Sequence, residues 1–479
     1  MDPHLDATAQ ADLVRAGEVS PRELVETSIE RIEALNGDLN AVIHPLFEQA
    51  LETEPADGPF RGVPFVVKDL ICSVEGTPHH EGMRFLKELG HRADADSWLA
   101  SRFRKAGFVF VGKTNTPELG ILPTTEPLAY GPSRNPWDTS RSTGGSSGGS
   151  GAAVASGMVA IGHANDGGGS IRIPASCNGL VGLKATRARV SMAPLGDFAS
   201  GLGTELVVSR SVRDTAAVLD WCCEETPPGE PYFAPPRERP YAQEVGADPG
   251  RLRIGLMTSA PAGMCEMDPD CVAAAEEAAK ALESLGHSVE RSHPPALDDE
   301  GYIENFLVRW TSAVAAGLDF WSLRTGRPIG PDDVEPATWA LAEQGRTHSG
   351  ARYLMAVGYA QLITRSVIEW WQSFDVLLTP TMAVPPAELG TIGSGADDPD
   401  PAMPIARAIP YAVYTAGFNA TGQPAISLPL HWTDGGLPIG VQLVGNLGRE
   451  DLLIRVASQL EEARPWAERR PPVFAAAAR

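Results

Sequence analysis

Apolar positions near the start of the chain recur with the period of an α-helix. Ser20-Pro21-Arg22-Glu23 has the form of a capping box with proline at the first helical position. The apolar positions that follow are Leu24, Ile29, Ile32 and Leu35, and Asn36-Gly37 supplies a stop signal. The pattern predicts an amphipathic helix from residue 21 to about residue 36.

Short apolar runs farther along are too brief for helices and predict buried strands. They cover residues 41–47, 63–67, 108–111, 252–257, 288–291, 374–378 and 441–444. Helical patterns lie between some of them, at residues 97–105 and 268–285. Strands that alternate with helices favour an α/β fold, with a mixed, twisted sheet covered by helices on both faces.

The chain is expected to form a single large domain over residues 1–479. Within it we expect an N-terminal helical segment (1–60), a core segment (61–190), variable insertions that shape a pocket (191–400) and a C-terminal part that returns to the core (401–479). Residues 227–240 are rich in proline and predict a surface connection, and residues 394–404 predict a loop.

Charge and composition exclude several classes of partner. The net charge is −22, and no block of Lys or Arg interrupts it, so neither nucleic acid nor an anionic membrane is an expected partner. The first ten residues hold no apolar run typical of a signal peptide. Six cysteines without a C-x-x-C pair predict free thiols and a cytoplasmic protein. The ten histidines show no zinc-binding spacing, so no metal and no cofactor is expected.

Glycine is concentrated in one region, with 12 of the 49 glycines between residues 144 and 182. A P-loop is excluded because Ser150-Gly151 stands where Lys-Ser/Thr is required, and no dinucleotide-binding glycine pattern occurs. Residues 145–149 match the G-x-S-x-G of a hydrolase elbow, but the polar residues 140–143 do not predict the strand it needs. A flexible linker is disfavoured because residues 152–161 continue as a dense apolar, helix-like pattern.

Several ordered motifs together resemble the amidase signature family of serine hydrolases. They are Gly62–Asp69, Gly112–Asn115, Arg134–Trp137, the glycine-rich region up to Lys184 and, more weakly, Gly422–Pro429. The resemblance implies an α/β amidase with a Ser–cis-Ser–Lys triad. Lys68 corresponds to the family's base, Ser146 to its bridging serine after a cis peptide bond with Gly145, and Ser170 to its nucleophile.

The chemistry of these residue types fits the implied roles. A serine hydroxyl is a weak nucleophile until a base takes its proton, and a lysine is a base only when burial keeps it neutral. The apolar residues before Lys68 provide such surroundings. The resemblance also implies an oxyanion hole of main-chain N–H groups at Gly167, Gly168 and Gly169. Asp166, Arg172 and Ser147 are the expected supporting residues, with Asp166 paired to Arg172.

Two departures from the common family pattern bear on the substrate. The segment Asn165-Asp166-Gly167-Gly168-Gly169-Ser170 has glycine where a branched residue is usual, which predicts a looser loop or a wider pocket. The segment is similar to that of the family's nylon-oligomer hydrolases, as are residues 6–11, 326–335 and 448–453. The resemblance implies that the helix before Gly326 lines the substrate pocket, and counting back from Gly326 places Trp310 there. Asn165 and Gly145 are further candidates for substrate binding.

The expected function is hydrolysis of the C–N bond of a small amide, either one like the 6-aminohexanoate cyclic dimer or an aryl amide. Carbamate hydrolysis, as in a urethanase, and aryl-acylamide hydrolysis are alternatives. The remaining alternatives are a subunit of a glutamyl-tRNA amidotransferase and a non-catalytic binding protein. The expected partner is a small-molecule amide, with a second copy of the chain as a candidate partner and no membrane.

Overall fold

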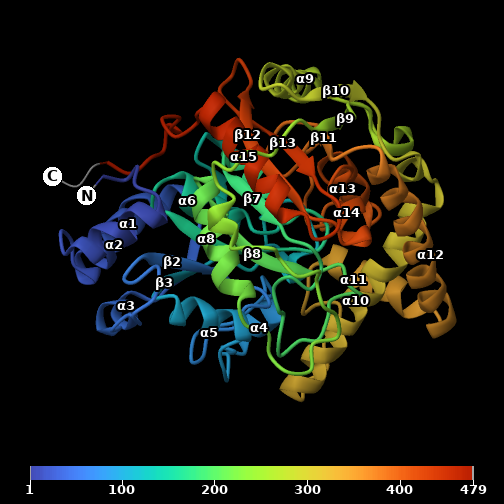
Figure 1. Ribbon diagram of the computed structural model, residues 1–479. Helices are drawn as coiled ribbons and strands as arrows, with labels where there is room; N and C mark the ends of the chain where they lie inside the picture. The colour runs from blue at the N-terminus through green and yellow to red at the C-terminus, as the bar shows by residue number, and fades with distance from the viewer. Residues whose placement is uncertain (1, 477–479) are drawn as a thin grey trace.

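The computed structural model describes residues 2–476 and is built around one mixed sheet of 11 strands (Figure 1). In spatial order these strands are β1 (Val42–Pro45), β3 (Val109–Thr114), β2 (Pro64–Lys68), β6 (Ile161–Asp166), β8 (Thr204–Ser209), β7 (Val181–Lys184), β12 (Ala425–Trp432), β13 (Pro438–Val444), β11 (Val376–Pro380), β9 (Arg253–Leu256) and β10 (Ser288–Arg291). A separate antiparallel ribbon pairs β4 (Arg134–Asn135) with β5 (Asp138–Ser142).

The large sheet contains two groups of parallel strands, one toward each edge, and β1 pairs antiparallel with β3 at the first edge. Strand β2 runs parallel to both β3 and β6, and β9 runs parallel to β10 and β11. The strands between these two groups pair antiparallel. The predicted β-α-β unit of residues 252–291 is therefore confirmed, since β9 and β10 are joined through a helix that begins at Pro269.

Fifteen α-helices surround the sheet in the described part of the chain. They are α1 (Ala7–Ala16), α2 (Pro21–Leu39), α3 (Phe47–Glu52), α4 (Arg84–Glu88), α5 (Trp98–Lys105), α6 (Gly148–Ala155), α7 (Arg172–Asn178), α8 (Val212–Cys223), α9 (Pro269–Ser284), α10 (Gly301–Thr325), α11 (Pro336–Thr347), α12 (Gly350–Glu369), α13 (Met403–Ala412), α14 (Ala416–Thr421) and α15 (Glu450–Ala463). Helices α6 and α7 contact each other, and α15 contacts both α8 and α9. The predicted α/β fold, a sheet with helices on both faces, is confirmed.

The sequence located the starts of the predicted helices to within one residue, but some predicted helix ends are wrong. In α2 the Ser20 hydroxyl accepts a hydrogen bond from Glu23 N, and the Glu23 carboxylate accepts one from Ser20 N. The helix does not stop at Gly37 but continues to Leu39, where Asn40 takes the left-handed conformation instead. Residues 152–161 are not one helix, because α6 ends at Ala155 and β6 begins at Ile161.

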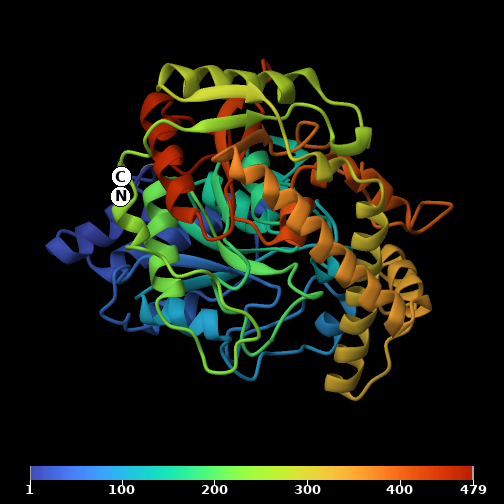
Figure 2. The same cartoon turned by 45° about the vertical axis from the view of Figure 1, so that its right-hand side comes forward.

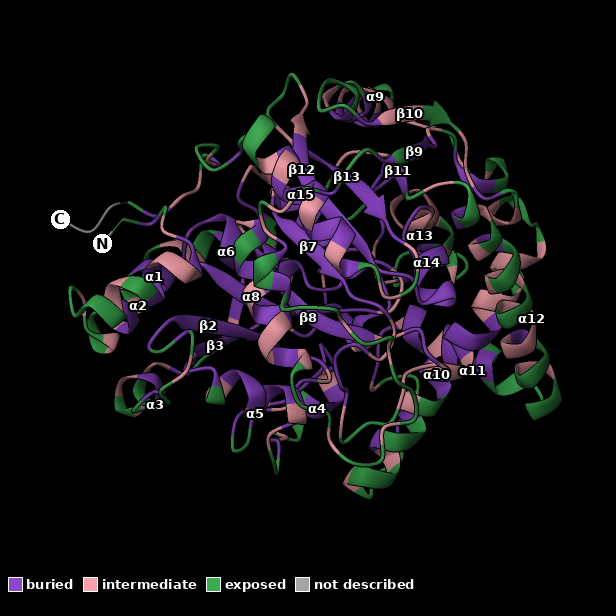
Figure 3. Ribbon diagram, in the orientation of Figure 1, coloured by how far each residue is buried: buried purple, intermediate pink, exposed green. Residues whose placement is uncertain are grey.

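Strands from all four expected segments of the chain join the same sheet. The segment 191–400 supplies β8, β9, β10 and β11, and it also supplies α10, α11 and α12, which gather on one side of the molecule in both views (Figures 1 and 2). The central strands are buried along most of their length, whereas exposed residues lie in outer helices, in loops and in edge strands such as β10 (Figure 3). Within residues 2–476, no helix combines the length and apolar character needed to cross a membrane.

Candidate active site

Lys68 lies at the end of β2, where it is completely buried. Its Nζ is 2.6 Å from the Ser146 hydroxyl and 2.6 Å from Asn165 Oδ1. Burial lowers the pKa of Lys68 well below its ordinary value, although Asp166 and Glu205 act in the opposite direction. Strand β2 thus ends at Lys68, whose burial favours the neutral amine and whose Nζ contacts the Ser146 hydroxyl.

Glycines surround Ser146 because main chain from other segments comes very close. The Gly145–Ser146 peptide bond is cis, as predicted. A Cβ atom at Gly145 would lie 2.4 Å from the carbonyl oxygen of Thr124, and one at Gly149 would lie 2.5 Å from the amide nitrogen of Asn115. Gly145 therefore serves close packing rather than contact with a cavity, and side chains at these positions would displace Ser146.

Ser147 and Asn165 hold each other and the lysine in place. The Ser147 hydroxyl donates to Asn165 O at 3.3 Å and accepts from Asn165 N at 3.4 Å. The Asn165 amide donates to Leu70 O while its oxygen accepts from Lys68. Both polar groups of the Asn165 side chain are thus used by the protein, although the residue lines a cavity beside Ser170.

Ser170 lies in the loop of residues 167–171 (here called the glycine loop), between β6 and α7. It is buried except for 8% of its surface, and it shares a small cavity of about 30 Å³ with Ser146. No hydrogen bond joins the two hydroxyls, and Ser170 Oγ has no partner among residues 2–476. The structure therefore brings Lys68, Ser146 and Ser170 to one place and leaves the Ser170 hydroxyl free to turn.

The main-chain N–H groups of the glycine loop are not equivalent. Gly169 N donates to Asp166 Oδ1 at 2.7 Å, so this N–H is already used by the protein, and its role in an oxyanion hole stays a prediction. The N–H groups of Gly167, Gly168 and Ser170 have no hydrogen-bond partner within the described chain. Gly169 has φ +139, and a Cβ there would lie 2.4 Å from Thr415 Oγ1, which explains glycine at this position.

Gly167 does not widen the pocket, contrary to the prediction. A Cβ at Gly167 would lie 3.2 Å from the Phe198 ring and 3.4 Å from the Trp310 ring. The two rings meet edge to face with centroids 5.8 Å apart, and Trp310 also stacks on Phe306 at 5.6 Å. The two aromatic rings occupy the space that a branched side chain at residue 167 would need, and they lie against the glycine loop.

Asp166 and Arg172 form the predicted ion pair, and both are fully buried. The guanidinium donates to both carboxylate oxygens at 2.9 Å, and it also donates to Thr415 O, Gln442 Oε1 and Asn419 Oδ1. The positive charge of Arg172 outweighs burial and lowers the pKa of Asp166 to about 2. Asp166 stays ionised and anchors Gly169 N and Ile171 N on either side of Ser170.

Three adjoining cavities lie at or near Ser170, and Ser170 itself lines two of them. An apolar one of about 120 Å³ includes Ser170, Trp310 and residues of α10 and α13, and no charged side chain lines it. The small cavity beside Ser146 shares Ser170 and Trp310 with it. A third, of about 490 Å³, shares Leu70 and Phe198 with the small one and carries the carboxylates of Glu81 and Asp197. Trp310 thus lines the space beside Ser170, as predicted.

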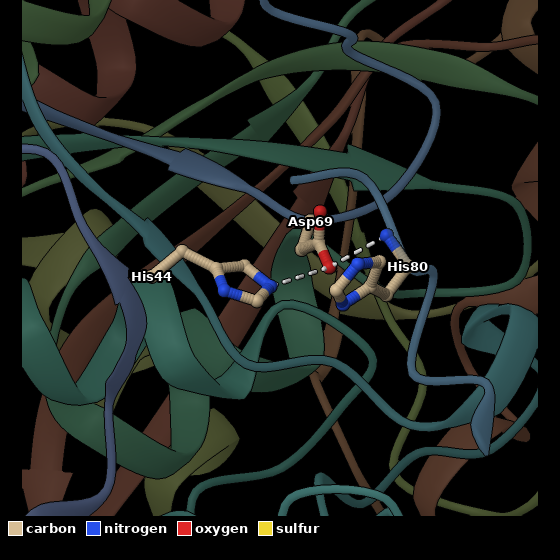
Figure 4. Close-up of side chains that lie close together, drawn as sticks. All are labelled: His44, Asp69 and His80. Carbon is tan, nitrogen blue, oxygen red and sulfur yellow. Dashed lines mark hydrogen bonds and ion pairs between the residues drawn. The ribbon is translucent and has the colours of Figure 1, made fainter. Parts of the chain in front are cut away.

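Asp69, the residue after Lys68, is the centre of a buried polar cluster with His44 and His80 (Figure 4). One Asp69 oxygen lies 3.5 Å from His44 Nε2 and accepts from His80 N, and the other is 2.6 Å from Lys113 Nζ. The ligand-type atoms of these three residues lie within 4.8 Å of one another. The Lys113 ammonium already neutralises the carboxylate and would repel a cation, so the cluster fits a structural ion pair better than a metal site.

Asp69→Asn is expected to lower the free energy of unfolding by about 3–5 kcal/mol, because it leaves the buried Lys113 ammonium without a counter-charge. Lys113 and nearby histidines hold the pKa of Asp69 far below its usual range, so the native pair is ionised at neutral pH. Urea unfolding measures the loss. Lys113→Met in the same chain should restore part of it, and a loss below about 1 kcal/mol in the single variant would contradict this role.

Several residues around the site could not be identified from the sequence. Helices α10 and α13 and the loop at Leu119-Gly120 form cavity walls, and a Cβ at Gly120 would approach Ser146 Oγ to 3.1 Å. Asn419 and Thr415 reach the site from α14 and the residue before it. The weak motif at residues 422–429 lies just after α14 and was the only indication that this segment returns to the site.

Comparison with known proteins agrees with the geometry. A family model described as Amidase matches residues 23–454. A 6-aminohexanoate-cyclic-dimer hydrolase from Pseudomonas sp. (strain NK87) is 45% identical over 98% of this chain and 97% of its own length. A solved 6-aminohexanoate cyclic dimer hydrolase complexed with substrate superimposes with TM-score 0.96 at 44% identity, covering 99% of this chain and 100% of that one. A bacterial aryl acylamidase of the amidase signature family superimposes with TM-score 0.86 at 25% identity, covering 97% of each chain.

Proposed function

The chain belongs to the amidase signature family of amide hydrolases, and we propose that it cleaves a small, uncharged amide by acyl transfer to Ser170. Neutral Lys68 takes the Ser146 proton while Ser146 takes the proton of Ser170, whose Oγ bonds to the amide carbonyl carbon. The C–N bond then breaks, and the amine leaves with a proton returned along the same path. Water attacks the acyl-enzyme in the same manner and releases the acid.

The contact between Lys68 and Ser146 is the observation that carries this proposal. A general base must lie within hydrogen-bond reach of the proton it removes and must be unprotonated near the working pH. Lys68 Nζ is 2.6 Å from Ser146 Oγ, and burial lowers the lysine pKa. Ser146 and Ser170 line one cavity, so a small rotation of the free Ser170 hydroxyl would complete the path.

The glycine loop would stabilise the negative charge that develops on the carbonyl oxygen. The N–H groups of Gly167, Gly168 and Ser170 are unpaired within the described chain and belong to the loop that presents Ser170. Each correctly aimed donor typically contributes about 10²–10³ in rate. The Asp166–Arg172 ion pair would hold this loop in position, because Asp166 accepts from Gly169 N and Ile171 N.

The walls of the cavities favour a neutral substrate with an apolar group beside the scissile bond. The cavity of about 120 Å³ has no charged side chain, so a free ammonium or carboxylate there would lose its hydration without compensation. A cyclic amide, as in the 45% identical hydrolase, has no charged ends. An aryl amide would also fit against Trp310, as the likeness to an aryl acylamidase suggests.

A panel of the 6-aminohexanoate cyclic dimer, its linear counterpart, aryl anilides and aryl carbamates tests the substrate class. We expect the neutral cyclic amide and the anilides to have a much higher kcat/KM than the linear dimer, whose ends are charged. Preference for the linear dimer would contradict the proposed substrate class, and preference for the carbamates over every amide would favour a urethanase.

Trp310→Leu is expected to lower kcat/KM for an aryl anilide about tenfold relative to an alkyl amide, because the ring forms a wall of both cavities next to Ser170. Steady-state kinetics on the two substrates measure the ratio. Trp371→Leu is the matched control, since both tryptophans are 7% exposed and Trp371 lies in a different core cluster. Equal losses on the two substrates in Trp310→Leu would contradict a role in substrate choice.

A further inference from the structure

A cavity outside the active-site region is lined by three arginines. It has a volume of about 320 Å³ and lies between α10, α12 and residues 197–203. We call it the arginine cavity, and its polar lining consists of Arg187, Arg309, Arg365, Ser200, Tyr232, Gln361 and Thr364. It shares no lining residue with the three cavities at or near Ser170.

The guanidinium groups of Arg187 and Arg309 bond only to main-chain carbonyls. Arg187 donates to Gly201 O, Asn419 O and Ala420 O at 2.7–3.0 Å, and Arg309 donates to Ala199 O and Ser200 O at 2.9–3.2 Å. These bonds use Nε and Nη2 of each arginine. Nη1 of each arginine makes no hydrogen bond within residues 2–476 and remains accessible to solvent. Each arginine therefore retains one donor group for a ligand.

Positive charge in this cavity is not balanced by nearby acids. Within the described chain, no carboxylate lies within 4 Å of Arg187, Arg309 or Arg365. Asp197 acts electrostatically on both Arg187 and Arg309, and its oxygens accept hydrogen bonds from Gly201 N and Tyr232. Burial and the charge of Arg309 lower the pKa of Arg187. In a chain of net charge −22, three arginines without a paired acid form a distinct cationic site.

The backbone around Arg187 and Arg309 is shaped to hold them. A Cβ at Gly201 would lie 2.5 Å from Arg187 Nε, and one at Gly422 would lie 3.1 Å from its Cζ. Ala199 and Ser200, which offer their carbonyls to Arg309, have positive φ of 48° and 56°. Residues without glycine's freedom rarely take this conformation, so the segment that offers its carbonyls to Arg309 is held at a local energetic cost.

We infer that the arginine cavity binds the carboxylate group of a short organic acid. Nη1 of Arg187, Nη1 of Arg309 and the guanidinium of Arg365 are charged donors that suit a carboxylate, and Tyr232, Gln361 and Thr364 provide further polar contacts. Val357, Ala360 and Ala420 also line the space and would contact an aliphatic chain. This apolar wall favours an organic acid over an inorganic oxyanion. Amide hydrolysis releases acids of this class, but the site does not depend on the role of Ser170.

Calorimetric titration of the full-length protein with sodium hexanoate, in a non-coordinating buffer and without turnover, tests this site. Arg365→Ala and Gln361→Ala are the test variants, because both side chains are exposed and neither makes a hydrogen bond or ion pair in the described chain. Arg251→Ala is the matched control at an exposed arginine elsewhere. Trp310→Leu reports binding in the active-site cavities, and hexylammonium and inorganic phosphate are the comparison ligands.

We expect hexanoate to bind wild type, Arg251→Ala and Trp310→Leu alike, and Arg365→Ala about tenfold more weakly, with a smaller loss in Gln361→Ala. Hexylammonium should not compete. The inference is overturned if hexanoate does not bind, or if Trp310→Leu and not Arg365→Ala weakens it. It is also overturned if phosphate binds as tightly as hexanoate, because the ligand would then be an inorganic oxyanion.

Discussion

Ser170→Ala is expected to lower kcat by about 10⁴–10⁶ on every amide that the enzyme hydrolyses. Without Oγ no acyl-enzyme can form, and only positioning and the N–H donors of the glycine loop remain. The substitution removes one atom at a residue that is 8% exposed and makes no side-chain hydrogen bond in the described chain. KM should therefore change little, and thermal unfolding should match that of the wild type.

Ser156→Ala is the matched control for this substitution. Ser156 is completely buried and its hydroxyl donates only to Ala153 O within the last turn of α6. It should retain kcat within a factor of about two, because nothing it contacts touches the cavities beside Ser170. Comparable kcat in the two variants, measured on one anilide with active enzyme quantified by mass, would contradict the assignment of Ser170.

Lys68→Met is expected to lower kcat/KM by about 10²–10⁴, the usual contribution of a general base. Methionine keeps the length of the side chain and removes the amine, so the buried volume is conserved. The pH dependence carries further information. A base must be unprotonated, so wild-type kcat/KM should rise as pH increases through the Lys68 pKa, which burial places below the ordinary value of about 10.4. Lys68→Met should lack that rise.

Lys184→Met provides the control, since Lys184 is also a buried lysine. Burial and the charge of Arg172 lower the pKa of Lys184 to about 7, and its Nζ donates to Ala185 O at 3.0 Å rather than to a serine. Its loss should leave both kcat and the pH profile nearly unchanged. If the pH-dependent rise persists in Lys68→Met and disappears in Lys184→Met, the base has been assigned to the wrong lysine.

The candidate site could be predicted from sequence where its residues lie in contiguous motifs. The run ending at Lys68, the glycines around Ser146 and the loop before Ser170 are local patterns, and the ends of β2 and β6 with the start of α6 bring them together. Their spacing is set by short connections, so little tertiary information is needed. The Asp166–Arg172 pair was implied by the family resemblance, and the structure contains it.

Features set by distant packing could not be read from the chain. Trp310 presses on Gly167 from a helix more than a hundred residues away, so a glycine that predicts a wider pocket is in fact covered by a ring. The hydrogen bond from Gly169 N to Asp166 depends on the local turn and removes one expected donor. The arginine cavity joins residues of α10, α12 and Arg187, which share no motif.

Rapid quenching of the enzyme with an aryl anilide, followed by peptide mass mapping, tests the central proposal most directly. If Ser170 is the nucleophile, the acyl group of the substrate will be found on the peptide carrying Ser170 during turnover and will disappear on longer incubation. The same peptide from Ser170→Ala will carry no acyl group. Turnover accompanied by acylation at another residue, or turnover in Ser170→Ala at the wild-type rate, would contradict the mechanism.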